Sequence, residues 1–204
     1  MTDLKRFLLH ILMSVKIKKH GKNNSVQISN SAHLRKVKIK IYGSNNSVII
    51  SDNTYLHNVY LRIGFKDCFV NNCLIQIGNN TSFNSADIQL GEDNSKIIIG
   101  EDNMFSFGIE IACTDTHSVT DFSGKLINYG KEIIIGNHNW ICKNVSIMKN
   151  SKIPNNCVIA QNSLITSKFT QDNTVIAGIP ARVVKENINW HRKRPCQYQN
   201  NENI

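Results

Sequence analysis

The sequence is poor in alanine and leucine, the residues that most favour helices. It contains 6 Ala and 11 Leu among 204 residues, against 29 Ile and 28 Asn. Because β-branched residues favour strands, this balance argues against a mainly helical protein. Asparagine tolerates left-handed backbone and local turns, so its abundance predicts many corners. The composition therefore indicates a β-rich chain that turns often.

The sequence also lacks a long apolar run and a paired-cysteine motif. No stretch approaches the roughly 18 consecutive apolar residues of a membrane-spanning helix. No two of the 6 cysteines form a CxxC pair, which leaves zinc binding without support. The apolar stretch near the N-terminus is short, is interrupted by His10 and precedes no small-residue cleavage site, so a signal peptide is disfavoured. We expect a cytoplasmic protein with free thiols and no bound metal.

A six-residue repeat is plain in the second half of the chain. Isoleucine recurs without a slip at positions 135, 141, 147, 153, 159 and 165. Six residues fit neither the period of an α-helix nor that of a flat strand, but they match one short strand plus a corner. Three such units make a triangular coil, so Ile135 stacks on Ile153 and Ile141 on Ile159. Stacked coils pair as parallel strands and bury the isoleucines inside a prism.

The first half of the chain carries a looser form of this repeat. GKNNSVQIS at 21–29 recurs as GSNNSVIIS at 43–51, and similar segments follow. Corner insertions explain why these offsets exceed the regular coil length. We therefore expect an all-β solenoid over 21–180, with a projecting loop at 112–132, where the repeat fails. Residues 181–204 form a closing segment with a basic tail that is expected to be mobile beyond Trp190.

The first 20 residues have an amphipathic pattern. Apolar residues at positions 4, 7, 8, 11, 12 and 15 follow the spacing of one helical face, and basic residues flank them. We expect residues 1–20 to form a short helical segment. It either caps the end of the solenoid or makes peripheral contact with an anionic membrane surface.

Several of these motifs resemble one enzyme family. Hexads that begin with an aliphatic residue, IGNHNWI at 135–141 and AGIPARVVKENI at 177–188 resemble the hexapeptide-repeat acyltransferases. TDTHSVTD at 114–121, followed by GKEIIIGNHNWI, looks like members that O-acetylate bacterial surface polysaccharides such as polysialic acid. The resemblance implies a left-handed parallel β-helix, acetyl-CoA as acyl donor and a glycan hydroxyl as acceptor, in capsule or lipopolysaccharide. It also implies a homotrimer with active sites between subunits.

The resemblance points to two catalytic residues and one supporting residue. His117 is the only histidine within the non-repeat loop, and a loop histidine serves as general base in the family; an imidazole suits that role near neutral pH. Asp115 or Asp121 is close enough in sequence to orient its ring. Trp140 lies at the outward position of its hexad and could donate its indole N–H to the thioester oxygen, or shape the acceptor site.

Five residues are candidates for binding CoA. The backbone at Cys142, where the family commonly has glycine, could point at the thioester, and Ala160 matches the lining of the pantetheine arm. A basic side chain forms charge-assisted bonds with phosphate. The predicted phosphate contacts are Lys168, Arg182 and Lys185.

Other functions on this scaffold fit the sequence less well. N-acetylation of a nucleotide-linked amino sugar is the alternative. A metal hydratase resembling γ-class carbonic anhydrases needs a histidine cluster, but only His117 and His138 lie in the right region. An ice-binding solenoid needs regular ranks of threonine on a flat face, but the hexads have asparagine, lysine and serine instead. The net charge of +9 favours encounter with CoA and an anionic glycan, whereas nucleic-acid binding is disfavoured because the sequence has no basic stripe with interleaved aromatic residues.

Overall fold

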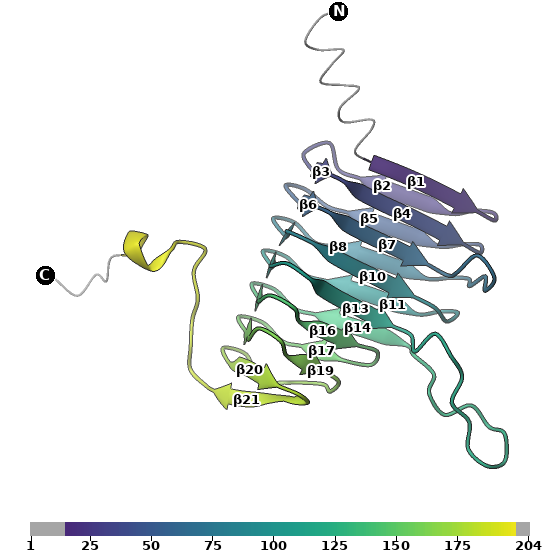
Figure 1. Cartoon of the computed structure of the whole chain (residues 1–204). Coiled ribbons are helices and arrows are strands. Elements are labelled where there is room, and N and C mark those ends of the chain that lie inside the picture. Colours follow the sequence, from purple (N-terminus) through teal and green to yellow (C-terminus); the bar gives the residue numbers. More distant parts are fainter. Residues whose placement is uncertain (1–14, 199–204) are drawn as a thin grey trace, which may run out of the picture.

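In the computed structural model, which describes residues 15–198, the chain winds into a triangular prism of stacked coils (Figure 1). Each coil visits three sheets in turn, and the strands pair in parallel between coils. The fold class expected from the sequence, an all-β left-handed parallel β-helix with a projecting loop, is confirmed.

Each face of the prism is one sheet. Sheet A contains β1 (Val15–His20), β4 (Val37–Tyr42), β7 (Val59–Ile63), β10 (Ala86–Leu90), β13 (Ile109–Cys113), β16 (Ser146–Met148) and β19 (Leu164–Ile165). Sheet B contains β2 (Ser25–Ile28), β5 (Ser47–Ile50), β8 (Leu74–Ile77), β11 (Lys96–Ile99), β14 (Glu132–Ile135) and β17 (Lys152–Ile153). Sheet C contains β3 (His33–Arg35), β6 (Tyr55–His57), β9 (Ser82–Phe83), β12 (Met104–Phe105), β15 (Trp140–Ile141), β18 (Val158–Ile159), β20 (Val175–Gly178) and β21 (Ala181–Lys185). We call the corners where the chain passes between sheets the A/B, B/C and C/A edges.

Stacked isoleucines fill the prism as the hexad spacing predicts. Ile135 pairs with Ile153 in sheet B, and Ile141 pairs with Ile159 in sheet C. All six hexad isoleucines are at most 1% exposed. Burial of each such side chain contributes on the order of 1.5–3 kcal/mol, so the aligned stack dominates the stability of the fold.

Asparagine occupies the corners. Thirteen of the seventeen non-glycine residues with positive φ among residues 15–198 are asparagine. Asparagine adopts this left-handed conformation more readily than most residues because its short side chain can bond locally. Other asparagines point inward: Asn103 Nδ2 donates to the carbonyl oxygen of Gly136 at 2.9 Å, and its Oδ1 accepts from the backbone N–H of Asn139 at 2.9 Å. The asparagine excess therefore both turns the chain and satisfies the corner backbone.

Both ends of the solenoid differ from expectation. Residues 1–14 of the predicted amphipathic segment lie outside the described residues, whereas its last six residues form strand β1, so the solenoid begins at or before Val15. The tail beyond Trp190 is not free, because Arg192 donates to Ser82 Oγ and to the carbonyl oxygens of Asn80 and Asn103, each at 3.1 Å. A short 3₁₀ helix, η1 (Pro195–Gln197), follows.

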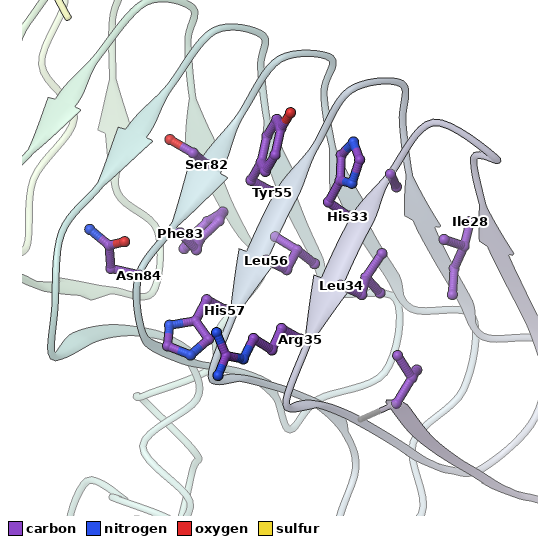
Figure 2. A pocket seen from close by; sticks show the side chains of 12 residues that line it. Ile28, His33, Leu34, Arg35, Tyr55, Leu56, His57, Ser82, Phe83 and Asn84 are labelled. Atoms are coloured by element: carbon purple, nitrogen blue, oxygen red, sulfur yellow. The ribbon is translucent and has the colours of Figure 1, made fainter. Parts of the chain in front are cut away.

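A pocket of about 700 Å³ opens on sheet C among the first described coils (Figure 2). Figure 2 shows Leu34, Leu56 and Phe83 in one row of its lining, with His33 and Tyr55 in another. Val15, the first described residue, also lines it, and the candidate residues from the sequence do not. We assign it no ligand. None of the described helices is long and apolar enough to cross a membrane.

Two neighbouring isoleucines on β11 test the packing. Ile97 is fully buried, whereas Ile98 points outward and is half-buried. We expect Ile97→Ala to lower the free energy of unfolding by about 2–5 kcal/mol and Ile98→Ala to lower it by about 1 kcal/mol or less, because only the first leaves a cavity in the core. Denaturant titrations of the two variants measure both losses. Equal losses would contradict the assigned inward and outward faces.

Candidate functional site

The loop of residues 114–131 leaves the prism at the A/B edge, after β13, and carries His117 (Figure 1). Asn128 fixes its base: Nδ2 donates to Asp115 Oδ2 at 2.9 Å and to the carbonyl oxygen of His117 at 2.8 Å. Lys149, from the next coil, pairs with Asp115 and donates to the carbonyl oxygen of Asn128 at 2.8 Å. His117 is exposed, and its imidazole has no partner among residues 15–198. The ring is therefore available to a substrate.

Asp115 does not contact the ring of His117, contrary to the sequence-based expectation. Its carboxylate binds Lys149 and Asn128 instead, and the hydrogen bond from Lys149 holds the pKa of Asp115 below its usual value. Asp121 accepts hydrogen bonds from backbone N–H groups of its own turn. Both carboxylates thus shape the loop backbone, and Asp115 is better described as a positioning residue.

Trp140 points outward from β15 on sheet C. Its side chain is 38% exposed, and within the described chain its indole Nε1 has no hydrogen-bond partner. The ring lies beside Trp190, with 6.2 Å between centroids and 40° between planes. Trp140 therefore presents an unused N–H donor at the surface.

His117 and Trp140 do not meet within one chain. The loop emerges where sheets A and B join, whereas Trp140 lies on sheet C, the one sheet that does not border this edge. The isoleucine-filled prism separates the two positions. A site that uses both residues therefore requires two chains.

Small side chains form a column along the C/A edge, next to Trp140. Cys142, Ala160 and Ala177 each follow an inward isoleucine of sheet C, and these isoleucines are in register. Ala177 pairs with Arg182 of β21, so Arg182 lies at the end of the column. The column offers a long thin ligand a path without bulky side chains that ends at a cation.

The backbone of this column is not available in the way the sequence suggested. The N–H of Cys142 donates to the carbonyl oxygen of Ile159, and that of Ala160 to Ile176, both at 2.9 Å. The parallel ladder continues one residue past each short strand, so these N–H groups hold neighbouring coils together and do not point at a thioester. Burial also raises the pKa of the Cys142 thiol to about 11, which keeps it neutral.

The three predicted phosphate contacts are not clustered. Lys168 lies beside sheet B, and its Nζ is 3.6 Å from Glu132 Oε1. Lys185 lies at the opposite end of β21 from Arg182. In the antiparallel hairpin of β20 and β21, Arg182 pairs with Ala177, whereas Lys185 pairs with Val175 at the other end. Of the three, only Arg182 therefore lies at the end of the small-residue column.

Comparison with known proteins supports a family assignment for this fold. The family described as bacterial transferase hexapeptide (six repeats) matches residues 132–167. The structure of the polysialic acid O-acetyltransferase OatWY has a TM-score of 0.76 and 31% identity, and the match covers 87% of this chain and 92% of that one. This chain belongs to the hexapeptide-repeat acyltransferases. The polySia-specific acetyltransferase NeuO is 25% identical with a TM-score of 0.72, over 90% of this chain and 84% of that chain.

Curated relatives of this acyltransferase include polysialic acid O-acetyltransferases. That of Neisseria meningitidis is 38% identical over 124 residues, which cover 60% of this chain and 57% of that protein. That of Escherichia coli O1:K1 is 32% identical over 117 residues, which cover 57% of this chain and 38% of that protein. This chain thus matches little more than half of the first relative and less than half of the second.

Sequence reasoning missed one cluster of this acyltransferase, at the B/C edge. His138 stacks on Trp190 at 4.4 Å, and its Nδ1 lies 2.6 Å from Asp102 Oδ2. Arg192 Nε donates to Asp102 Oδ1 at 2.9 Å. Burial raises the pKa of Asp102, but the bonds from His138 and Arg192 outweigh it and lower that pKa. The cluster fixes the tail beside Trp140, and an isolated tryptophan in a polar tail was its only sequence signal.

The thiols of Cys142 and Cys68 should react at different rates. Cys142 is half-buried with a pKa of about 11, whereas Cys68 is exposed. Because the thiolate is the nucleophile, we expect iodoacetamide at pH 8 to label Cys68 at least tenfold faster, and labelling of Cys142 to rise as pH approaches 11. Peptide mass spectrometry over a pH series measures both rates. Fast labelling of Cys142 at pH 8 would contradict its burial.

Proposed function

We propose that this protein is an acetyl-CoA-dependent O-acetyltransferase that modifies a hydroxyl of an anionic bacterial surface glycan, in capsule or lipopolysaccharide, with polysialic acid as the leading acceptor. The observation that carries the proposal is the imidazole of His117, which is exposed and has no partner among residues 15–198. It lies on a loop that leaves a prism whose fold matches a polysialic acid O-acetyltransferase along most of both chains. The net charge of +9 favours encounter with both anionic substrates.

His117 is the general base of the proposed reaction. Its neutral ring removes the proton from the acceptor hydroxyl as the hydroxyl oxygen attacks the acetyl carbonyl carbon. The tetrahedral intermediate then collapses, the carbon–sulfur bond breaks, and the thiolate of CoA takes the proton from the imidazolium. Asn128 and the ion pair of Asp115 with Lys149 hold the backbone of His117 in place.

Trp140 supplies a hydrogen bond to the developing oxyanion. Its Nε1 has no partner in the described chain, so no bond has to be broken before it donates. The N–H groups of Cys142 and Ala160 are used by the coil ladder, which leaves the indole as the stronger candidate donor.

The acyl donor fits the small-residue column. Cys142, Ala160 and Ala177 leave room for a thin pantetheine chain, and Arg182 at the end of the column suits a phosphate. Lys185 and Lys168 are further proposed phosphate contacts, although Lys168 must first leave Glu132.

The proposed active unit is a homotrimer with three equivalent sites. One chain provides the loop with His117 at its A/B edge, and a neighbour provides Trp140 and the column at its C/A edge. The triangular cross-section supports this proposal, because no single chain presents both sets to one space.

Loss of the base should abolish most of the activity. We expect His117→Ala to lower kcat for acetyl transfer by about 10²–10⁴-fold, the usual contribution of a general base, and His33→Ala on the far coils to leave it unchanged. Thiol release from acetyl-CoA with polysialic acid measures both. A loss below tenfold would remove His117 from this role, and turnover only with a nucleotide-linked amino sugar would favour the N-acetyltransferase alternative.

Mixed oligomers test the shared site. Trp140→Phe keeps the ring but removes the N–H, and we expect kcat to fall about 10²-fold or more if the indole donates to the oxyanion. When His117→Ala and Trp140→Phe chains are co-expressed, about a quarter of the sites in a random cyclic trimer combine an intact histidine with an intact tryptophan. Purified mixed trimers should regain activity accordingly. An unchanged kcat for Trp140→Phe would exclude the donor role, and no recovery on mixing would contradict a site between chains.

A further inference from the structure

Four lysines form a grid on the outer face of sheet A at the N-terminal end of the prism. Lys16 and Lys38 are direct neighbours on β1 and β4, and so are Lys18 and Lys40. Adjacent strands lie about 4.8 Å apart, so these side chains sit closer than a Debye length. None of the four ammonium groups has a hydrogen bond or ion pair among residues 15–198. Like charges placed directly opposite each other are destabilising, so the grid favours a bound anion.

Aromatic rings lie among these cations. The Nζ atoms of Lys38 and Lys40 lie 4.8 Å and 5.9 Å from the ring centre of Tyr60 on β7. The guanidinium of Arg62, on the same strand, lies 5.3 Å from that ring and 4.7 Å from the ring of Phe65. Arg62 Nε is buried without a partner. These side chains form a basic stripe with interleaved aromatic residues. The stripe is not evident in the linear sequence because its residues come from successive coils that become neighbours only in the folded chain.

The charges on sheet A are divided between two columns of paired residues. The first column, near the C/A edge, runs through Lys16, Lys38, Tyr60, Asp87, Glu110 and Ser146. The second column, near the A/B edge, runs through Lys18, Lys40, Arg62, Gln89 and Ala112. The first column therefore turns acidic, whereas the second contains no carboxylate. A polyanion on this face is directed to the second column.

The second column leads to the loop of His117. Ala112 lies on β13, and the loop begins directly after this strand at the same edge (Figure 1). Three strand spacings separate β4 from β13, which is about 14 Å. A chain-like substrate that reaches His117 can therefore continue along the same face to Arg62, Lys40 and Lys18.

We propose that the second column of sheet A, from Lys18 to Arg62, is a binding site for the anionic glycan polymer, separate from the acetylation site and continuous with it. The inference rests on the proposed function for the identity of the polymer. The carboxylates of successive sugars pair with the lysines, and the site holds the polymer while His117 acts on one residue of it. Short acceptors fill the acetylation site but do not reach the column.

The matched experiment compares two double variants of equal charge. Lys18→Gln/Lys40→Gln alters the column, and Lys152→Gln/Lys193→Gln removes the same charge from sheet B and the tail. For long polysialic acid, we expect the first variant to raise KM roughly three- to tenfold with kcat unchanged, and the second to change neither. KM for a sialic acid dimer should stay the same in both. The difference should shrink with added salt, because exposed charges are screened.

A binding assay separates this proposal from the proposed function. Anisotropy of fluorescently labelled polysialic acid with the purified full chain needs no turnover, so loss of affinity in Lys18→Gln/Lys40→Gln alone supports the site even if no glycan is acetylated. Equal affinity or equal KM in both double variants overturns it. Tighter binding of single-stranded oligothymidylate or of anionic phospholipid vesicles at this column, measured by competition, also overturns it. If the double variant fails to fold, the single variant Lys18→Gln, at an exposed position, is tested with the same measurements and judged by the same outcomes.

Discussion

The stacking of inward isoleucines is the interaction on which the rest of this molecule depends. A single coil cannot bury its own apolar side chains, so each coil is stable only between two others. The same stacking also occupies the backbone N–H groups in hydrogen bonds between coils. That of Cys142, for example, donates to the next coil although it lies outside the short strands. Chemistry is therefore left to outward side chains and to the loop of residues 114–131, which leaves the prism.

A rigid triangular cross-section also decides how a site can be assembled. The loop of His117 belongs to the A/B edge, and Trp140 belongs to the opposite sheet, with a filled core between them. No rotamer change brings these side chains together, so a site that uses both needs a second prism. Oligomerisation is then part of the proposed chemistry, and the ordered tail lies beside Trp140, the residue proposed for the shared site.

Charge is distributed unevenly over this scaffold. Near the tail, Arg192 is neutralised by Asp102, and Lys149 at the loop base is neutralised by Asp115. The lysines of β1 and β4 have no such partner in the described chain. Lysines without a carboxylate partner among residues 15–198 therefore lie where a polyanion could bind, on the face that leads to the loop.

The sequence by itself determined the architecture and the position of the loop. Ile135 through Ile165 set the six-residue period, corner asparagines mark the turns, and the failure of the period marks the segment around His117. These signals lie in short segments that recur along the chain, so they can be recognised from the sequence alone. Only the tertiary structure decided that Asp115 binds Lys149, that His138 stacks on Trp190, and that Lys18, Lys40 and Arg62 form one column. Irregular segments separate Asp115 from Lys149 and His138 from Trp190, so no fixed spacing predicts those two contacts. The column does follow the 22-residue offset of the early repeat, but that offset places the three side chains side by side only once the coils are stacked.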